Sequence, residues 1–276
     1  MTENKAVNIN SGWLDTLYTK FVDLSCNMLI ATVKKGPIPK HIGFIMDGNR
    51  RFAKNNKIET RMGHLAGFSS LQNILKWCLR LDVKAVTVYA FSIDNFNRPK
   101  DEVESLMELA KVKIYELTEN RQVENMQEFI EEHRLRIRSI GKLDLLPTDV
   151  REKMEEITFK TKDNNGPVLN ICIPYLSTHE ISTAISSVSQ QVSNGTLDPE
   201  DITESLIESN LFTNDSPQLE LIIRTSGETR LSNFLLWQAS KNVLIKFVDV
   251  YWPEFTLLKL VGILLDYQIE KLQQKE

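Results

Sequence analysis

The sequence predicts an α/β protein with a mostly parallel central sheet flanked by helices. Short runs rich in Val, Ile and Leu alternate along the chain with longer segments of helical periodicity, which is typical of a parallel sheet. Hydrophobic residues make up 42% of the 276 residues and charged residues 25%, so the chain can bury a core and is not expected to be disordered.

Six runs have the composition of buried strands, because each is short and apolar and is bounded by polar or turn-forming residues. The predicted strands are 41–46, 85–90, 135–140, 168–173, 219–223 and 244–248.

The segments with helical periodicity lie mainly between these strands. The predicted helices are 13–33, 64–80, 101–132, 147–162, 178–193, 200–209, 233–241 and 255–273. The segment 101–132 is predicted as one unusually long helix, roughly 45 Å if it is continuous.

The N-terminal segment 1–36 is predicted as a loose tail followed by an amphipathic helix, and 37–276 as one domain. The stripe on this helix is followed by Lys34 and Lys35, with Lys40 a little further on. The helix either packs on the body of the protein or contacts a membrane or lipid substrate through its stripe. The apolar stripe comprises Trp13, Leu14, Leu17, Phe21, Leu24, Met28 and Leu29.

Several classes of protein are disfavoured by what the sequence lacks. The net charge of −4 argues against a nucleic-acid polycation, although residues 1–60 carry an excess of basic residues. The three cysteines form no CxxC pair, and the chain contains no P-loop, GxGxxG or GxSxG motif. The sequence lacks a signal-peptide pattern, and the apolar stretch 24–33 is too short to cross a bilayer, so we expect a soluble chain in a reducing compartment.

Three predicted strands run directly into polar segments that share one chemistry. These segments are 47–51 (DGNRR), 92–98 (SIDNFNR) and 224–233 (RTSGETRLSN). Ligands of parallel sheets bind beyond the carboxyl ends of the strands, so the three segments are expected to meet there.

The residue types in these segments are suited to phosphate. Arginine donates hydrogen bonds in pairs and remains charged, and a glycine turn before a helix adds backbone donors. Asp47 is expected to be the lone carboxylate among these cations, as for a Mg²⁺ ion that bridges to phosphate oxygens. The sequence therefore predicts a metal-assisted site for one or more phosphates.

Five blocks of the sequence resemble the signature blocks of cis-prenyltransferases. They are HIGFIMDGNRRFAK at 41–54, GHLAGF at 63–68, VTVYAFSIDNFNRP at 86–99, IRTSGETRLSNFLLWQ at 223–238 and WPEF at 252–255. Within that family the chain is most similar to the eukaryotic dehydrodolichyl diphosphate synthase branch, as the double arginine and the FSIDNF form indicate.

The resemblance implies an undecaprenyl diphosphate synthase-like fold with a hydrophobic tunnel, in which 37–276 is the catalytic domain. It also implies a reaction that adds isopentenyl diphosphate repeatedly to an allylic diphosphate such as farnesyl diphosphate. By motif match, Asp47 would hold Mg²⁺, and Asn95, with His64 and Ser92, would lie beside the reacting centre. The allylic diphosphate would be bound by Gly48, Asn49, Arg50, Arg51 and Arg98, and isopentenyl diphosphate by Arg224, Arg230 and Ser232.

The sequence departs from the family pattern at two places. The position of a metal-organising Glu in bacterial members falls near Val243, so the resemblance implies that the metal site rests on Asp47 and the substrate phosphates. The chain also has no Arg after Trp252, so the C-terminal Arg-x-Gly element of single-subunit members is missing. The resemblance therefore implies a heteromer with a Nogo-B-receptor-like subunit. It places the chain peripherally on the cytoplasmic face of the endoplasmic reticulum, in dolichol synthesis for protein glycosylation.

The residues disfavour two other functions. A non-catalytic prenyltransferase-like scaffold could lose Asp47 or the arginines, which this chain retains. A phosphatase would need a nucleophile with an activating base, and none is convincingly arranged. The apolar residues of two predicted helices fit either a core or a tunnel wall; these are Leu71, Ile74, Leu75, Trp77 and Cys78, and Leu106, Met107, Leu109, Ala110, Val112 and Ile114.

Overall fold

The computed structural model describes residues 20, 24–118 and 126–274, which belong to two compact units. One unit is 39–256, and the other combines 1–38 with 257–276. The sequence places 257–276 in the larger domain, whereas the structure groups it with the N-terminal segment.

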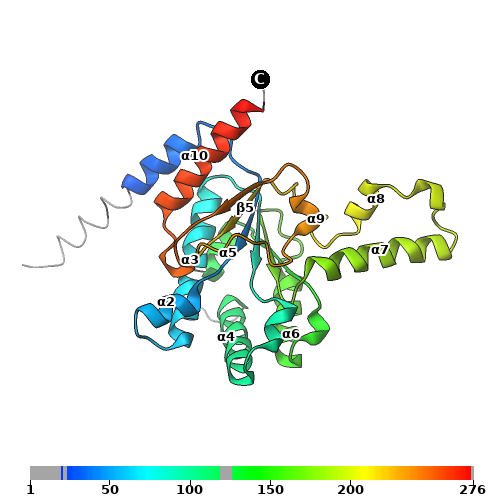
Figure 1. The fold of residues 1–276 in the computed structure, drawn as a ribbon, viewed down its shortest axis with the longest axis horizontal. Helices are drawn as coiled ribbons and strands as arrows, with labels where there is room; N and C mark the ends of the chain where they lie inside the picture. The colour runs from blue at the N-terminus through cyan, green and yellow to red at the C-terminus, as the bar shows by residue number, and fades with distance from the viewer. Residues whose placement is uncertain (1–19, 21–23, 119–125, 275–276) are drawn as a thin grey trace, which may run out of the picture. The chain divides into compact units, whose positions relative to one another are not determined.

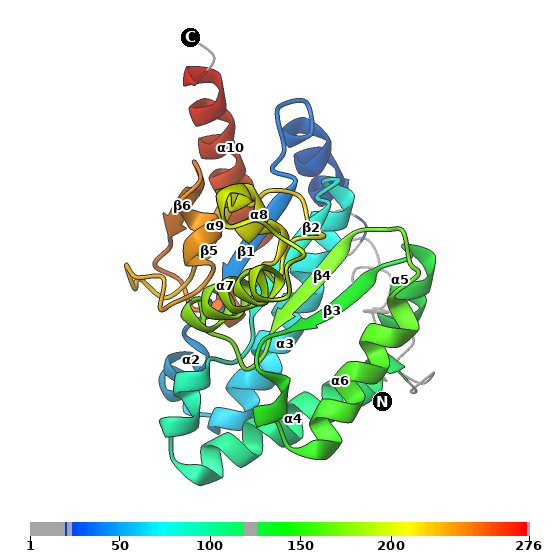
Figure 2. The ribbon, with the colours of Figure 1, turned by 90° about the vertical axis from the view of Figure 1, so that its right-hand side faces the viewer.

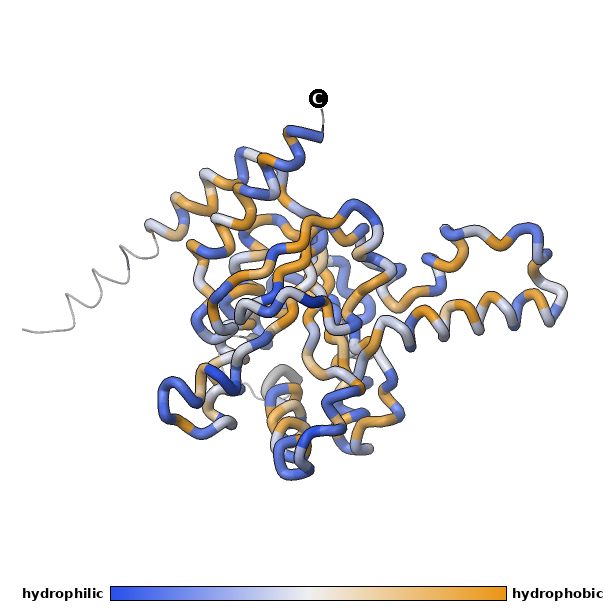
Figure 3. The backbone as a smooth tube through the Cα atoms, viewed as in Figure 1, coloured by the Kyte–Doolittle hydropathy of each residue, from blue (hydrophilic) through white to orange (hydrophobic). Residues whose placement is uncertain are grey.

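The larger unit is built on one parallel sheet, for which the described residues supply six strands in the order β3-β4-β2-β1-β5-β6 (Figure 2). All six predicted strands are confirmed within a few residues. They are β1 His41–Ile45, β2 Ala85–Tyr89, β3 Arg136–Ile140, β4 Val168–Cys172, β5 Leu221–Arg224 and β6 Leu244–Phe247. Every residue of β1 and β5 is buried, and apart from His41 and Arg224 these strands are apolar rather than alternating. The hydropathy colouring in Figure 3 shows the central strands mostly as hydrophobic.

Helices cover both faces of this sheet, with α3 on one side and α7 on the other (Figures 1 and 2). The helices are α2 Asn49–Asn55, α3 Thr60–Arg80, α4 Lys100–Thr118, α5 Met126–Glu132, α6 Thr148–Thr161, α7 Ser177–Ser193, α8 Glu204–Ser209 and α9 Leu236–Ala239. Short 3₁₀ turns form at η1 Ile93–Asn97, η2 Leu143–Leu145, η3 Pro199–Asp201 and η4 Trp252–Glu254.

The prediction of one long helix over 101–132 is wrong. Helices α4 and α5 occupy this region and pack against each other, which a single straight helix over the same residues would not allow. Phe129 and Ile130 on α5 are buried, so tertiary packing rather than local periodicity decides the path of the chain here.

The smaller unit contains a helical segment at 24–33 and helix α10, Leu257–Gln273. The Gln268 side chain donates to the Val33 carbonyl at 2.8 Å, which joins the two helices. Leu24 and Met28 are 58% and 64% exposed. Trp13, Leu14, Leu17 and Phe21 of the predicted stripe lie outside the described residues. Across the part of the chain that the structure describes, no helix combines the length and apolar character needed to cross a membrane.

The sheet order brings the three polar segments together. Strand β1 pairs with β2 on one side and with β5 on the other, with Ile45 in register with Tyr89 and with Arg224. The segments 47–51, 92–98 and 224–233 therefore leave three neighbouring strands at one edge of the sheet, as the sequence predicted.

Candidate functional site

A cavity of about 1090 Å³ opens at the carboxyl ends of β2, β1 and β5. Its lining includes all twelve residues predicted for the site: Asp47, Gly48, Asn49, Arg50, Arg51, His64, Ser92, Asn95, Arg98, Arg224, Arg230 and Ser232. The segments 47–51, 92–98 and 224–233, which are far apart in the sequence, thus form the cationic part of the cavity lining, called the mouth below.

The first loop turns sharply at Gly48, which has a left-handed backbone at φ 103°. A Cβ atom at Gly48 would lie 2.8 Å from the Tyr251 ring, so only glycine fits both the angle and the space. Helix α2 follows at once and carries Arg50 and Arg51 to the cavity.

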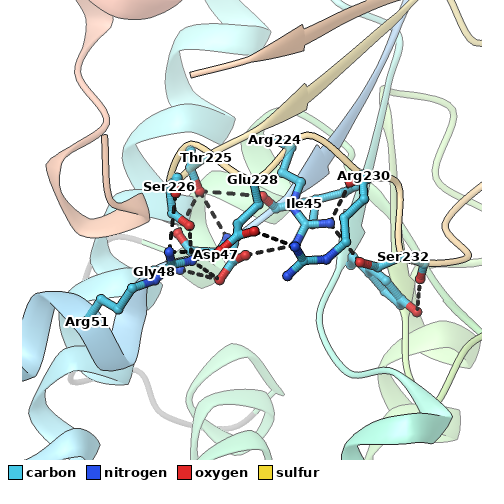
Figure 4. Close-up of polar contacts among 11 residues, drawn as sticks. Ile45, Asp47, Gly48, Arg51, Arg224, Thr225, Ser226, Glu228, Arg230 and Ser232 are labelled. Carbon is cyan, nitrogen blue, oxygen red and sulfur yellow. Dashed lines mark hydrogen bonds and ion pairs between the residues drawn. The ribbon is translucent and has the colours of Figure 1, made fainter. Parts of the chain in front are cut away.

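Asp47 and the buried Arg224 form an ion pair at the base of this mouth (Figure 4). Arg224 donates to Asp47 Oδ2 at 2.9 Å, and the Gly48 N–H donates to Asp47 Oδ1 at 2.7 Å. Burial alone would raise the pKa of Asp47, but the hydrogen bond from Arg224 and the charges of Arg224 and Arg51 hold it below its usual value. Asp47 is therefore ionised at neutral pH.

Glu228 links Arg51 of α2 to Arg230 of the segment after β5. It accepts from Arg51 at 3.0 Å and also pairs with Arg230, while Arg51 additionally donates to the Ser226 hydroxyl (Figure 4). The expectation that Asp47 would be the lone carboxylate is therefore wrong, because Glu228 also lines the cavity.

A second glutamate holds the other pair of arginines. Glu102, on α4, accepts from Arg98 at 2.9 Å and from Arg50 at 3.5 Å. His64 lies nearby, and its Nε2 is buried with no hydrogen-bond partner among the described residues. Burial lowers the pKa of His64 to about 4, and the positive charge of Arg98 acts in the same direction, so the imidazole is neutral.

Ser92 and Asn95 form a capping box on η1. The Asn95 side chain accepts the Ser92 N–H at 3.1 Å, and the Ser92 hydroxyl accepts the Asp94 N–H at 3.2 Å. These contacts fix the turn that carries Arg98, and both residues face the cavity.

Part of the cavity lining is apolar, which separates several of the residues that fit either a core or a tunnel wall. From α3, Leu71 lines the cavity, whereas Ile74, Leu75 and Cys78 are buried in the core. From α4, the lining residues are Leu106, Met107, Leu109, Ala110 and Ile114, whereas Val112 is 38% exposed at the surface.

Other lining residues had not been assigned to the site from the sequence. Lys54 lies one helical turn beyond Arg50 and Arg51 on α2, a spacing that could have identified it. Trp252, assigned only to the WPEF block, is almost fully buried; its N–H donates to the Asp47 carbonyl at 3.0 Å and its indole to the Gly67 carbonyl at 2.7 Å. No local signal marks such long-range contacts.

The donor set fits a divalent cation only if substrate oxygens complete its coordination. Within the described residues, no group of three or more His, Cys, Asp or Glu side chains could hold a metal ion by itself. Asp47 is ionised and lines the cavity, and one carboxylate together with phosphate oxygens is a common Mg²⁺ arrangement.

A cavity at the strand ends of a parallel sheet, lined by both arginines and apolar side chains, fits ligands that carry phosphate groups and a hydrocarbon chain. The family model for putative undecaprenyl diphosphate synthases matches residues 45–274. The chain therefore belongs to this cis-prenyltransferase family.

Individual relatives agree with this assignment. The chain is 45% identical to a dehydrodolichyl diphosphate synthase complex subunit of Schizosaccharomyces pombe, over 88% of this chain and 90% of the relative. It is 48% identical to the corresponding human subunit, over 86% of this chain and 69% of the relative. Among solved structures, lavandulyl diphosphate synthase from Lavandula x intermedia superimposes with a TM-score of 0.73 at 29% identity, covering 83% of this chain and 95% of that chain.

Proposed function

We propose that this chain extends an allylic diphosphate such as farnesyl diphosphate by repeated addition of isopentenyl diphosphate, making a long polyprenyl diphosphate. The observation that carries the proposal is the composition of one cavity, whose lining combines arginines with apolar side chains. The arginines suit the diphosphates, and the apolar wall suits the growing chain.

The two diphosphates would use different parts of the mouth. Arg50 and Arg98, which share Glu102, would bind the allylic diphosphate together with Gly48, Asn49 and Arg51. Arg224, Arg230 and Ser232 would bind isopentenyl diphosphate. Arg51 lies between the two groups, because Glu228 joins it to Arg230.

Charge stabilisation is the main task of these side chains. Negative charge grows on the allylic diphosphate as its carbon–oxygen bond breaks, and fixed arginines stabilise that charge without reorganising. Neutral His64 and the amide of Asn95 would line the space where the new carbon–carbon bond forms. Asp47 would hold Mg²⁺ with the substrate oxygens, and the ion would supply further charge neutralisation.

A non-catalytic scaffold is the alternative within the same family. Such a subunit has no need of a complete set of cationic side chains around Asp47. The convergence of all twelve predicted residues on one cavity favours the enzyme.

We also propose that the chain works with a different subunit of the Nogo-B-receptor type on the cytoplasmic face of the endoplasmic reticulum, in dolichol synthesis for protein glycosylation. The words "complex subunit" in the names of two relatives support a heteromer. The exposed Leu24 and Met28, followed by exposed Lys34 and Lys35, support peripheral membrane contact.

The direct test is an assay with farnesyl diphosphate, labelled isopentenyl diphosphate and Mg²⁺, with and without the candidate partner. Long polyprenyl products are expected. Absence of any elongated product from the chain and from the complex would contradict the proposal.

A further inference from the structure

The turn at 232–235 carries an unusual backbone at the edge of the cavity. Ser232, Asn233 and Leu235 are non-glycine residues with left-handed φ angles of 49°, 61° and 46°. Such angles are unfavourable for most L-residues, although Asn tolerates them, and they persist only where surrounding contacts enforce them. The turn therefore needs an anchor.

The anchor is the N-terminus of α7. Leu176, which precedes this helix, supplies no side-chain cap. Instead, the Asn233 carbonyl accepts the Ser177 N–H at 2.8 Å, and Asn233 Oδ1 accepts the Thr178 N–H at 3.0 Å. Asn233 Nδ2 in turn donates to the Thr178 hydroxyl at 3.0 Å. Asn233 thus satisfies N–H groups that the first turn of a helix leaves open.

The contact is reciprocal. The hydroxyl of Ser177, a fully buried residue, accepts the N–H of Leu236 at 2.9 Å, and Leu236 is the first residue of α9. The turn therefore caps α7 through Asn233, and Ser177 at the start of α7 caps α9 in return.

The turn contributes Ser232 and Asn233 to the cavity lining, and Ser232 contacts Arg224 there. The Ser232 hydroxyl accepts from Arg224 Nη1 at 2.7 Å, and its carbonyl accepts from the Tyr89 hydroxyl at 3.2 Å. The Tyr89 ring of β2 stacks on Phe234 of the turn with centroids 4.9 Å apart, which packs the turn against the sheet. A turn that relaxed would move Ser232 away from Arg224.

We propose that Asn233 is a positioning residue for isopentenyl diphosphate: by capping α7 it holds the left-handed turn that places Ser232 beside Arg224. This rests on the proposed function, which assigns Ser232 and Arg224 to that substrate. Asn233 acts through its neighbours, since its side-chain oxygen and nitrogen both bond to Thr178.

The test is steady-state kinetics with both substrates, on whichever form of the full chain, alone or in complex, is most active. Asn233→Ala removes both side-chain bonds and disfavours the left-handed angle. It is expected to raise the KM for isopentenyl diphosphate about tenfold, equivalent to roughly 1.4 kcal/mol, with the KM for farnesyl diphosphate unchanged. Asn233→Gly loses the bonds but accepts the angle, so a smaller rise is expected.

Two threonine variants of α7 complete the series. Thr178→Val removes one partner of Asn233 and is expected to raise the same KM about threefold, since one of the two side-chain bonds remains. Thr183→Val is the matched control, because that exposed hydroxyl donates to the His179 carbonyl of its own helix at 2.8 Å; no change in either KM is expected.

The outcomes separate this inference from the proposed function. An unchanged KM for isopentenyl diphosphate in Asn233→Ala, or an equal rise for both substrates, would overturn the positioning role. A lower thermal midpoint with both KM values unchanged would show a purely structural cap and overturn it as well. If Arg230→Ala also leaves the KM for isopentenyl diphosphate unchanged, the assignment of that substrate to this part of the mouth is overturned instead.

Discussion

Arg224 and Asp47 meet at 2.9 Å although they lie 177 residues apart in the sequence, and the arginine side chain is only 4% exposed. The carboxylate of Asp47 is ionised, and its Oδ2 already accepts a hydrogen bond from the fixed guanidinium of Arg224. Removing either member of the ion pair leaves a charge at the base of the cavity without its partner, so the choice of substitution matters.

Asp47→Asn is expected to reduce turnover by about a thousandfold or more, because the proposed metal-assisted departure of the diphosphate would be worth several kcal/mol of barrier. The measurement is the rate of incorporation of labelled isopentenyl diphosphate at saturating Mg²⁺. Asp163→Asn, at an exposed position outside the cavity lining, is the matched control and should retain the parent rate. Near-normal turnover by folded Asp47→Asn protein would contradict the role of this carboxylate.

Arg98→Ala and Arg230→Ala should separate the two substrates. Arg98→Ala should mainly raise the KM for the allylic diphosphate, and Arg230→Ala that for isopentenyl diphosphate, each about 10- to 100-fold for a lost charge-assisted contact. Arg136→Ala is the control, since Arg136 pairs with Asp215 outside the cavity lining. Equal effects of each mutation on both substrates would show that the partition is wrong.

Stability should fall in mild acid because His41 is buried in a neutral form. Its ring bonds to the Pro217 carbonyl at 2.8 Å and to the Thr87 hydroxyl at 2.7 Å, and burial lowers its pKa to about 4. The unfolded chain takes up this proton near pH 6.5, so stability present above that pH is lost progressively as the pH falls towards 4.

For His41 alone, the loss between pH 7.5 and pH 5 is expected to be about 2 kcal/mol of unfolding free energy. Urea denaturation at the two pH values measures it. His41→Gln cannot take up the proton and should show a correspondingly flatter dependence. An identical pH dependence in parent and variant would rule out His41 as the cause.

The apolar stripe of the N-terminal helix should contact membranes. Leu24→Ser with Met28→Ser removes two exposed apolar side chains and should reduce flotation with liposomes that contain anionic lipid, while the first condensation continues. Phe159→Ser, at a 68% exposed position of α6, is the control and should float like the parent. If flotation is unchanged but thermal stability falls sharply, the helix is only a packing element.

The proposed heteromer predicts that the chain needs a second subunit for full activity. Purified chain alone is expected to turn over far more slowly than the pair co-expressed with a Nogo-B-receptor-like subunit. Initial rates at equal concentrations of the catalytic chain give the comparison. A full rate from the isolated chain, which the partner cannot raise, would refute the heteromer.

The strands were predictable because buried parallel strands are continuously apolar and short, and each such run in this chain ends in a polar segment. The path after α4 was not predictable, since helical periodicity continues through 101–132 and carries no information about a reversal that depends on packing. Short periodic segments such as α9 were predicted too long for the same reason.

The site was predictable to the extent that its residues are local to strand ends. Asp47, Arg98 and Arg230 could be identified because each stands in a segment whose composition suits phosphate. The pairing of Arg51 with Glu228 could not be, because it joins residues 177 positions apart. The capping role of Asn233 depends in the same way on where α7 begins.

The position of β1 between β2 and β5 also constrains how the protein matures. Strand β1 can pair with β2 once about ninety residues have been synthesised. The other edge of β1 stays unpaired until β5, which begins at Leu221, has been synthesised. Contacts between residues so far apart in sequence form slowly, and a waiting strand edge is prone to aggregation. The diphosphate pocket is thus completed late on the ribosome, and destabilising changes in β5 should reduce the yield of soluble protein in cells even where they leave purified enzyme active.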